Sequence, residues 1–169
     1  MTIIDGTTGI DKITDGSVVQ ADLASGVSST GPAFSSYRTS NQSISANTLT
    51  KVAWNTERFD TNSNYDNTTN YRFTPTVAGY YLVNSVILID GKNTGFVNNH
   101  IYKNGASYIF HRTGDNSTGD FGASVTALIY LNGTTDYIEN YVRHNNSATD
   151  LLINTSELGE FSAHLVRAA

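Results

Sequence analysis

Alternating apolar and polar positions predict β-strands along most of the chain from Ala33 onward. The clearest case is 121–131, where every second residue from Phe121 to Leu131 is apolar. Further strands are predicted at 34–38, 49–55, 80–89, 96–103, 107–112, 137–144 and 160–167. No stretch of this part of the chain has the period of an amphipathic helix.

The segment 80–89 is apolar on both faces, which predicts a central strand covered on both sides. One face carries Tyr80, Leu82, Val86 and Leu88, and the other carries Tyr81, Val83, Ile87 and Ile89. We expect one face to enter the core of the domain. The second face is expected to meet either another layer of the fold or a neighbouring subunit.

Turn-forming dipeptides separate these strands at intervals of about ten residues. Asn104-Gly105 joins two predicted strands and is a strong hairpin signal, and Asn132-Gly133 introduces another turn. About eight to ten antiparallel strands with such spacing indicate an all-β sandwich or barrel. The sequence therefore predicts a β-sandwich domain over 31–169, with its boundary at Gly31-Pro32.

Residues 1–30 differ from the rest, because they contain no aromatic residue and only scattered apolar ones. Such a segment buries too little apolar area to fold alone, so we predict an extended N-terminal arm that anchors the domain or forms a trimer stem. Its expected contacts are the apolar residues Ile3, Ile4, Ile10, Ile13, Val18, Val19, Leu23 and Val27.

Composition narrows the functional classes further. A net charge of −5 with scattered basic residues argues against a nucleic-acid-binding surface. The absence of cysteine excludes disulfides and thiolate metal sites. The first residues lack the basic start and apolar core of a signal peptide, and no apolar run is long enough to span a bilayer.

Motifs of catalysis are also missing, which predicts a protein that is not an enzyme and needs no cofactor. There is no Gly-x-Ser-x-Gly elbow, no cysteine nucleophile and no phosphate-binding glycine loop. If Asn104-Gly105 is a two-residue turn, His100 and His111 lie diagonally on one face, where they would either bind a metal or bond polar neighbours. Calcium has candidate ligands in the loop residues Asp60, Asp66, Asp115 and Asp120, which Asx turns explain equally well.

The stretch from Trp54 to Ser85 resembles the signature of the C1q-like globular head, within the C1q/tumour-necrosis-factor superfamily. The matching positions are Trp54, Asp60, Tyr65, Phe73, Gly79, Tyr81 and Val83. Trp54 and Val83 stand where the family has other aromatic residues, and one extra residue separates Tyr65 from Phe73. The resemblance implies a jelly-roll head that assembles as a compact homotrimer. The residues expected in its trimer interface or core are Trp54, Phe73, Tyr80, Tyr81, Leu82, Val83, Leu128 and Tyr130.

The arm sequence DGTTGIDKITDGSVVQADLASGV resembles polar segments that precede the terminal heads of bacteriophage fibre and other virion proteins. This implies a phage virion protein that is made in the host cytoplasm and exposed on the outer surface of the particle. We expect a capsid decoration or cement protein, or a short head fibre, with other virion proteins such as the major capsid protein as partners. The alternatives are a tail-fibre tip that binds the host receptor, and a soluble C1q-like module that binds carbohydrate or protein.

Overall fold

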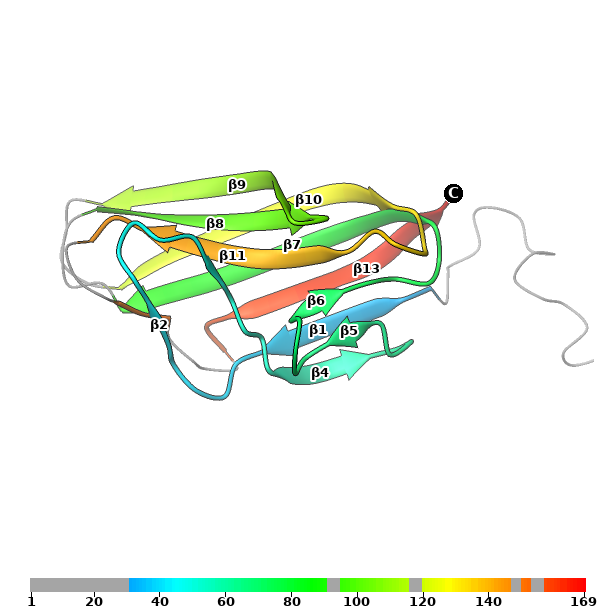
Figure 1. Cartoon of the computed structure of the whole chain (residues 1–169), viewed down its shortest axis with the longest axis horizontal. Coiled ribbons are helices and arrows are strands. Elements are labelled where there is room, and N and C mark those ends of the chain that lie inside the picture. Colours follow the sequence, from blue (N-terminus) through cyan, green and yellow to red (C-terminus); the bar gives the residue numbers. More distant parts are fainter. Residues whose placement is uncertain (1–30, 91–94, 116–119, 147–149, 153–156) are drawn as a thin grey trace, which may run out of the picture. The chain divides into compact units, whose positions relative to one another are not determined.

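The computed structural model describes residues 31–90, 95–115, 120–146, 150–152 and 157–169, and within these ranges it contains thirteen β-strands and no helix. Five of the strands span only two or three residues. The eight longer ones build a two-layered antiparallel sandwich (Figure 1). The all-β sandwich expected from the sequence is confirmed. The predicted arm and its eight apolar contact residues lie outside the described residues.

The strands are numbered in the order in which they follow one another along the chain. They are β1 (Ala33–Tyr37), β2 (Gln42–Ile44), β3 (Thr50–Lys51), β4 (Thr56–Asp60), β5 (Tyr65–Asp66), β6 (Arg72–Phe73), β7 (Gly79–Asp90), β8 (Gly95–Lys103), β9 (Ala106–Asp115), β10 (Phe121–Leu131), β11 (Ile138–His144), β12 (Asp150–Leu152) and β13 (Glu160–Ala168). No helix capable of crossing a membrane is found in the described part of the chain.

The first sheet, which we call sheet A, is built around the long strand β7. Its order is β2-β12-β7-β13-β1-β4, and β10 also pairs with β7. The pairing of β7 with β10 is unbroken from Gly79 opposite Leu131 to Ile89 opposite Phe121. Because this register has no bulge, residues that alternate along both strands fall into continuous rows on each face.

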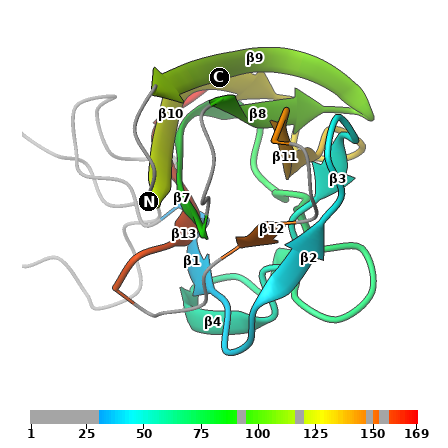
Figure 2. The same cartoon turned by 90° about the vertical axis from the view of Figure 1, so that its left-hand side faces the viewer.

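The second sheet, sheet B, has the order β5-β6-β11-β8-β9, with β3 paired to β11. The two sheets pack face to face, and β9 adjoins β10 along one side of the sandwich (Figures 1 and 2). The turn at Asn104-Gly105 joins β8 to β9 and has positive φ at both residues, as a two-residue hairpin turn requires.

The core between the sheets is rich in aromatic rings. Phe34 stacks on Tyr65 with ring centroids 4.5 Å apart and on Phe73 at 4.6 Å. Four of the residues expected in the core or interface belong to this core: Trp54, Phe73, Tyr81 and Val83 are all buried. The hydroxyl of Tyr81 donates to the carbonyl of Val77 at 2.7 Å, and burial raises its pKa to about 12.

The strand predicted at 49–55 is much shorter in the structure. Only Thr50–Lys51 is a strand, which pairs with Tyr141 and Val142 of β11. Beyond it, Val52 still donates its backbone N–H to the carbonyl of Asn140. The chain then directs the Trp54 indole inward to Asn140 rather than continuing along the sheet. Because Val52 and Trp54 are both buried, the segment shows the alternation of a longer strand although its backbone leaves the sheet.

Candidate functional site

The candidate site is a group of apolar side chains that this chain leaves uncovered on sheet A. Tyr80, Leu82 and Val86 of β7 are 45%, 37% and 37% exposed, although the alternate residues of the same strand are fully buried. Leu128 and Tyr130 of β10 are 54% and 41% exposed beside them. We call these five residues the apolar face. Large contiguous apolar patches on a soluble domain mark sites of interaction with another molecule.

The strand register brings the members of the apolar face together. Tyr80 lies opposite Tyr130, and Leu82 lies opposite Leu128. The two tyrosine rings meet edge to face with centroids 5.6 Å apart. In the next row, Thr126 donates its hydroxyl to Asn84 Oδ1 at 2.9 Å, so the polar residues there satisfy one another within the chain. The two paired strands thus hold the aromatic and aliphatic side chains of the apolar face in adjacent rows.

The question of which face of 80–89 is core is answered by this arrangement. The face of Tyr81, Val83, Ile87 and Ile89 is the core, and the face of Tyr80 is the open one. We expected both faces to be covered, and within a single chain only the face of Tyr81 is covered. The predicted interface or core residues therefore divide into two groups. Exposed in a single chain are Tyr80, Leu82, Leu128 and Tyr130, and buried in its core are Trp54, Phe73, Tyr81 and Val83.

A second exposed apolar group lies on β9, the outermost strand of sheet B. Tyr108 and Ile109 are 52% and 40% exposed, and the neighbouring Phe110 is 49% exposed. Tyr108 is the extra residue of a β-bulge, because Ile101 pairs with Ile109 while Tyr102 pairs with Ser107. Sequence reasoning missed this group, since the bulge breaks the simple alternation of the strand.

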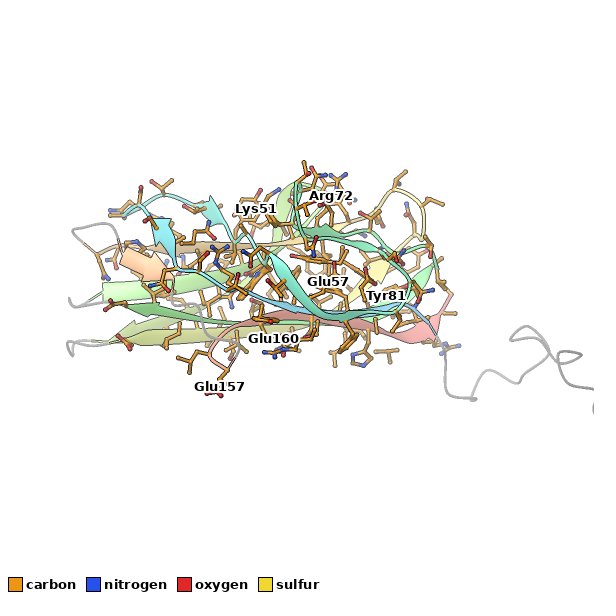
Figure 3. The ribbon with its side chains drawn as sticks, turned by 90° about the horizontal axis from the view of Figure 1, so that it is seen from below. Lys51, Glu57, Arg72, Tyr81, Glu157 and Glu160 are labelled. Carbon is orange, nitrogen blue, oxygen red and sulfur yellow. The ribbon has the colours of Figure 1, made fainter. Side chains whose placement is uncertain are left out.

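A cavity of about 160 Å³ borders the apolar face at Asn84 and Val86. Its charged lining comes from Arg58, Glu157 and Glu160, and Leu158 and Gly159 complete it. Arg58 Nε lies 3.9 Å from Glu160 Oε2, and its guanidinium lies 4.8 Å from the ring centroid of Tyr37. Figure 3 shows Glu157 and Glu160 on one side of the sandwich and Lys51 and Arg72 on the other.

The predicted histidine pair is wrong, because the bulge at Tyr108 shifts the hairpin register by one residue. His100 lies opposite Phe110, and His111 lies opposite Asn99. The two imidazoles therefore point to opposite faces of sheet B. His111 Nδ1 lies 3.0 Å from the carbonyl oxygen of Ser124, and His100 stacks on Phe110 with a centroid distance of 4.7 Å.

Two of the four calcium candidates have carboxylates that cap their own loops. Asp60 accepts the backbone N–H groups of Asn62 and Tyr65, at 3.3 and 2.7 Å. Asp66 accepts those of Thr68, Thr69 and Asn70, and these bonds, led by Thr69, hold the pKa of Asp66 well below its usual range.

Of the other two candidates, Asp120 is exposed just before β10, and the side chain of Asp115 lies outside the described part. The described residues contain no group of three His, Cys, Asp or Glu side chains that could hold a metal ion.

The sequence matches no family model and no curated protein. Solved structures nevertheless share its fold. Murine APRIL at pH 5.0 superposes with a TM-score of 0.63 at 13% identity, covering 80% of this chain and 99% of its own. The globular domain of zebrafish complement 1qA gives 0.56 at 18% identity, covering 82% and 99%, and Eiger TNF from S. frugiperda gives 0.62 at 10%, covering 82% and 93%.

The described part of this chain has two antiparallel sheets and no helix, and this architecture agrees with the similarity to these solved structures. At such low identity they show the fold and leave the biological role open. The described domain has the jelly-roll fold of the C1q and tumour-necrosis-factor domains.

Proposed function

We propose that this chain is a non-enzymatic, homotrimeric head whose apolar face is the contact between subunits. The observation that carries the proposal is the ordered apolar surface of Tyr80, Leu82, Val86, Leu128 and Tyr130, which a single chain leaves in water. Burying it against a neighbour removes a solvation cost of about 25 cal/mol for each Å² of apolar surface. The trimeric assembly implied by the C1q-like resemblance supplies such a neighbour.

The most suitable partner for the apolar face is the β9 edge of the next subunit. Tyr108 and Ile109 there are also exposed apolar residues, and they belong to sheet B, whereas the apolar face belongs to sheet A. Two different patches that bind each other form a head-to-tail contact, which closes into a ring when the rotation between subunits is right. A ring of three would cover both patches on every copy, with an obligate interface above about 2,000 Å².

The biological setting that we propose is the outer surface of a bacteriophage particle. Support for it comes from the acidic, aromatic-free segment 1–30 and its resemblance to segments that precede phage heads. In this proposal the arm attaches the trimer to the particle through other virion proteins such as the major capsid protein, as a decoration or cement protein or a short head fibre. Three arms on one trimer would add avidity to contacts that are individually weak.

An add-back experiment on virions that lack the protein tests this setting. The full chain should bind such particles, whereas a chain that starts at Gly31 should still fold and trimerise but fail to bind. Immunogold labelling should then place the full chain on the capsid. Labelling at the tail tip would instead favour a receptor-binding tail fibre. If neither form bound particles, the soluble carbohydrate- or protein-binding module would become the better account.

A further inference from the structure

The outward face of sheet B combines arginines with aromatic rings, of which Phe110 is exposed and Phe96 and Tyr141 are half-buried. Strand alternation and register place Phe96, His100, Phe110, Arg112, Tyr141 and Arg143 on this face, and we call these six residues the basic aromatic face. Tyr141, His100 and Phe110 form one row across β11, β8 and β9. Arg143 and Arg112 lie in the next row, on either side of Asn98.

The two arginines of this face are held close together around one ring. The guanidinium carbon of Arg112 lies 4.1 Å from the centroid of Phe96, and that of Arg143 lies 5.6 Å from the same centroid. Arg112 Nε donates to Asn98 Oδ1 at 2.9 Å, which orients its guanidinium. Arg143 donates to the backbone oxygen of Asn47 from Nε at 3.3 Å and to Asn47 Oδ1 from Nη2 at 3.4 Å.

Two neighbouring cations repel each other, and carboxylates nearby would normally offset the repulsion. Within the described ranges neither guanidinium has a carboxylate within 4.0 Å, since the ion pairs there join Lys51 to Glu139, Arg58 to Glu160 and Lys103 to Asp136. Planar guanidiniums with unused N–H donors are suited to bind a carboxylate through two parallel hydrogen bonds.

A buried polar atom without a partner lies beside the two arginines. His100 is 8% exposed, and its Nδ1 lies 3.0 Å from the hydroxyl of Ser107. Its Nε2 is buried and has no hydrogen-bond partner. The ring of Phe110, itself 49% exposed, stacks on the imidazole. A ligand hydroxyl that reached Nε2 past the edge of this ring would give the imidazole the hydrogen bond it lacks.

We propose that the basic aromatic face binds an oligosaccharide that carries carboxylate groups. Arg112 and Arg143 bind the carboxylate of one sugar, and the rings of Tyr141 and Phe110 stack against the apolar faces of adjacent sugars. Flat rings with amphipathic edges suit a sugar ring. Two arginines around one ring match a single carboxylate, whereas the backbone of a nucleic acid carries a phosphate at every nucleotide and needs a longer run of cations. All six residues belong to one chain, so this site is independent of the trimer and of the virion setting.

Titration of the full chain with paired glycans tests the proposal. The acidic probes are 3′-sialyllactose and a hexamer of mannuronic acid, and their neutral counterparts are lactose and mannohexaose. We expect at least one acidic probe to bind, and its neutral counterpart to bind at least tenfold more weakly. Arg112→Gln or Arg143→Gln should each weaken binding by about tenfold, because each removes charge-assisted hydrogen bonds. Higher salt should weaken binding as well.

Matched variants separate recognition from a general charge effect. Arg167→Gln removes the same charge at an exposed position near the end of β13 and should leave the affinity within about twofold. Tyr141→Leu should bind the acidic probe more weakly than Tyr141→Phe does, because only the phenylalanine keeps a flat ring for a sugar to stack on. The proposal is overturned if neither acidic probe binds, or if binding survives in the Arg112→Gln, Arg143→Gln double variant whose circular dichroism matches that of the wild type.

Discussion

The indole Nε1 of Trp54 donates a hydrogen bond of 3.0 Å to Oδ1 of Asn140 in the centre of the sandwich. The amide of Asn140 in turn donates to Asn99 Oδ1 at 2.7 Å and to the carbonyl of His100 at 2.9 Å. Asn99 continues the network to Ser85 and to the carbonyl of Ala123. This buried chain of bonds links strands of both sheets, and each amide in it has its partners.

Replacing Asn140 with alanine should therefore destabilise the fold strongly. The change removes the Asn140 partner of the Trp54 indole N–H and of the His100 carbonyl, whereas Asn99 Oδ1 still accepts from the Ser85 hydroxyl. Each unmet buried group costs about 1–3 kcal/mol, so the loss of two such bonds should lower stability by about 2–6 kcal/mol in denaturant unfolding. Asn62→Ala, at an exposed loop position, is the control and should change stability by less than about 0.5 kcal/mol. Equal effects of the two changes would contradict the structural role of the network.

Gly133 should tolerate alanine less well than Gly105. Both glycines have positive φ, at 72° and 78°, which costs any other residue about 1–2 kcal/mol. A Cβ on Gly133 would lie 2.4 Å from the backbone nitrogen of Ala78, whereas a Cβ on Gly105 would meet only the Tyr137 hydroxyl at 3.5 Å. We expect a loss of about 1–2 kcal/mol for Gly105→Ala and more than about 3 kcal/mol for Gly133→Ala. Thermal melts of the two variants measure this order. A larger loss for Gly105→Ala than for Gly133→Ala would contradict the close contacts described at Gly133.

Asp66 should make the protein less stable in acid. Its folded-state pKa lies below the usual range because three backbone N–H groups bond the carboxylate, so the stabilisation is present above the unfolded pKa of about 3.9 and is lost as the pH falls through the folded value. The melting temperature of Asp66→Asn should thus lie below that of the wild type at pH 7, and the gap should narrow toward pH 3. Asp120→Asn, which changes an exposed carboxylate, is the control. A difference in melting temperature between Asp66→Asn and the wild type that did not change with pH would contradict a lowered pKa at Asp66.

A strong chelator should leave the melting curve unchanged. The carboxylates of Asp60 and Asp66 already accept backbone N–H groups, so neither is free to act as a metal ligand without giving up its loop bonds. A structural metal contributes folding free energy, which its removal would take away. A drop of several degrees on chelation would revive the calcium hypothesis, and Asp120 and Asp115 would be the first residues to replace.

Much of this fold could be predicted from local patterns. The alternation of 121–131 and the apolar run of 80–89 correspond to β10 and β7, and the Asn104-Gly105 turn lies where the dipeptide indicated. The pairing is right next to the turn, where Lys103 lies opposite Ala106, and fails beyond the bulge at Tyr108. The sequence does not show where a bulge will form, and this bulge changes which residues lie opposite each other, so the common face predicted for His100 and His111 is wrong.

Local sequence patterns could predict only part of the candidate site. The apolar faces of Tyr80 and Tyr81 are equally hydrophobic in sequence, and only the packing of sheet B against one of them decides which is the core. The clustering of Arg112 and Arg143 around Phe96 depends on the register of the bulged β8–β9 hairpin and on the pairing of β8 with β11, which lies far from it in the chain. Such long-range pairings have no local signal.

An acidic group on the apolar face should separate assembly from folding. Leu82→Asp leaves a charge that is solvated in one chain, because Leu82 is 37% exposed, but buried and unpaired in an interface. The variant should keep a wild-type β-sheet spectrum in circular dichroism while losing the trimer. Leu49→Asp is a matched control, since Leu49 is 36% exposed on the loop before β3, and should leave assembly intact. If Leu82→Asp still assembled, the contact would lie elsewhere on the domain.

Sedimentation equilibrium of the wild-type chain at micromolar concentration tests the central claim most directly. We expect a single folded species with three times the mass of one 18.3 kDa chain, which does not dissociate on dilution through the micromolar range. A stable, folded species with the mass of one chain would contradict the claim, because the apolar face would then remain in water without a partner.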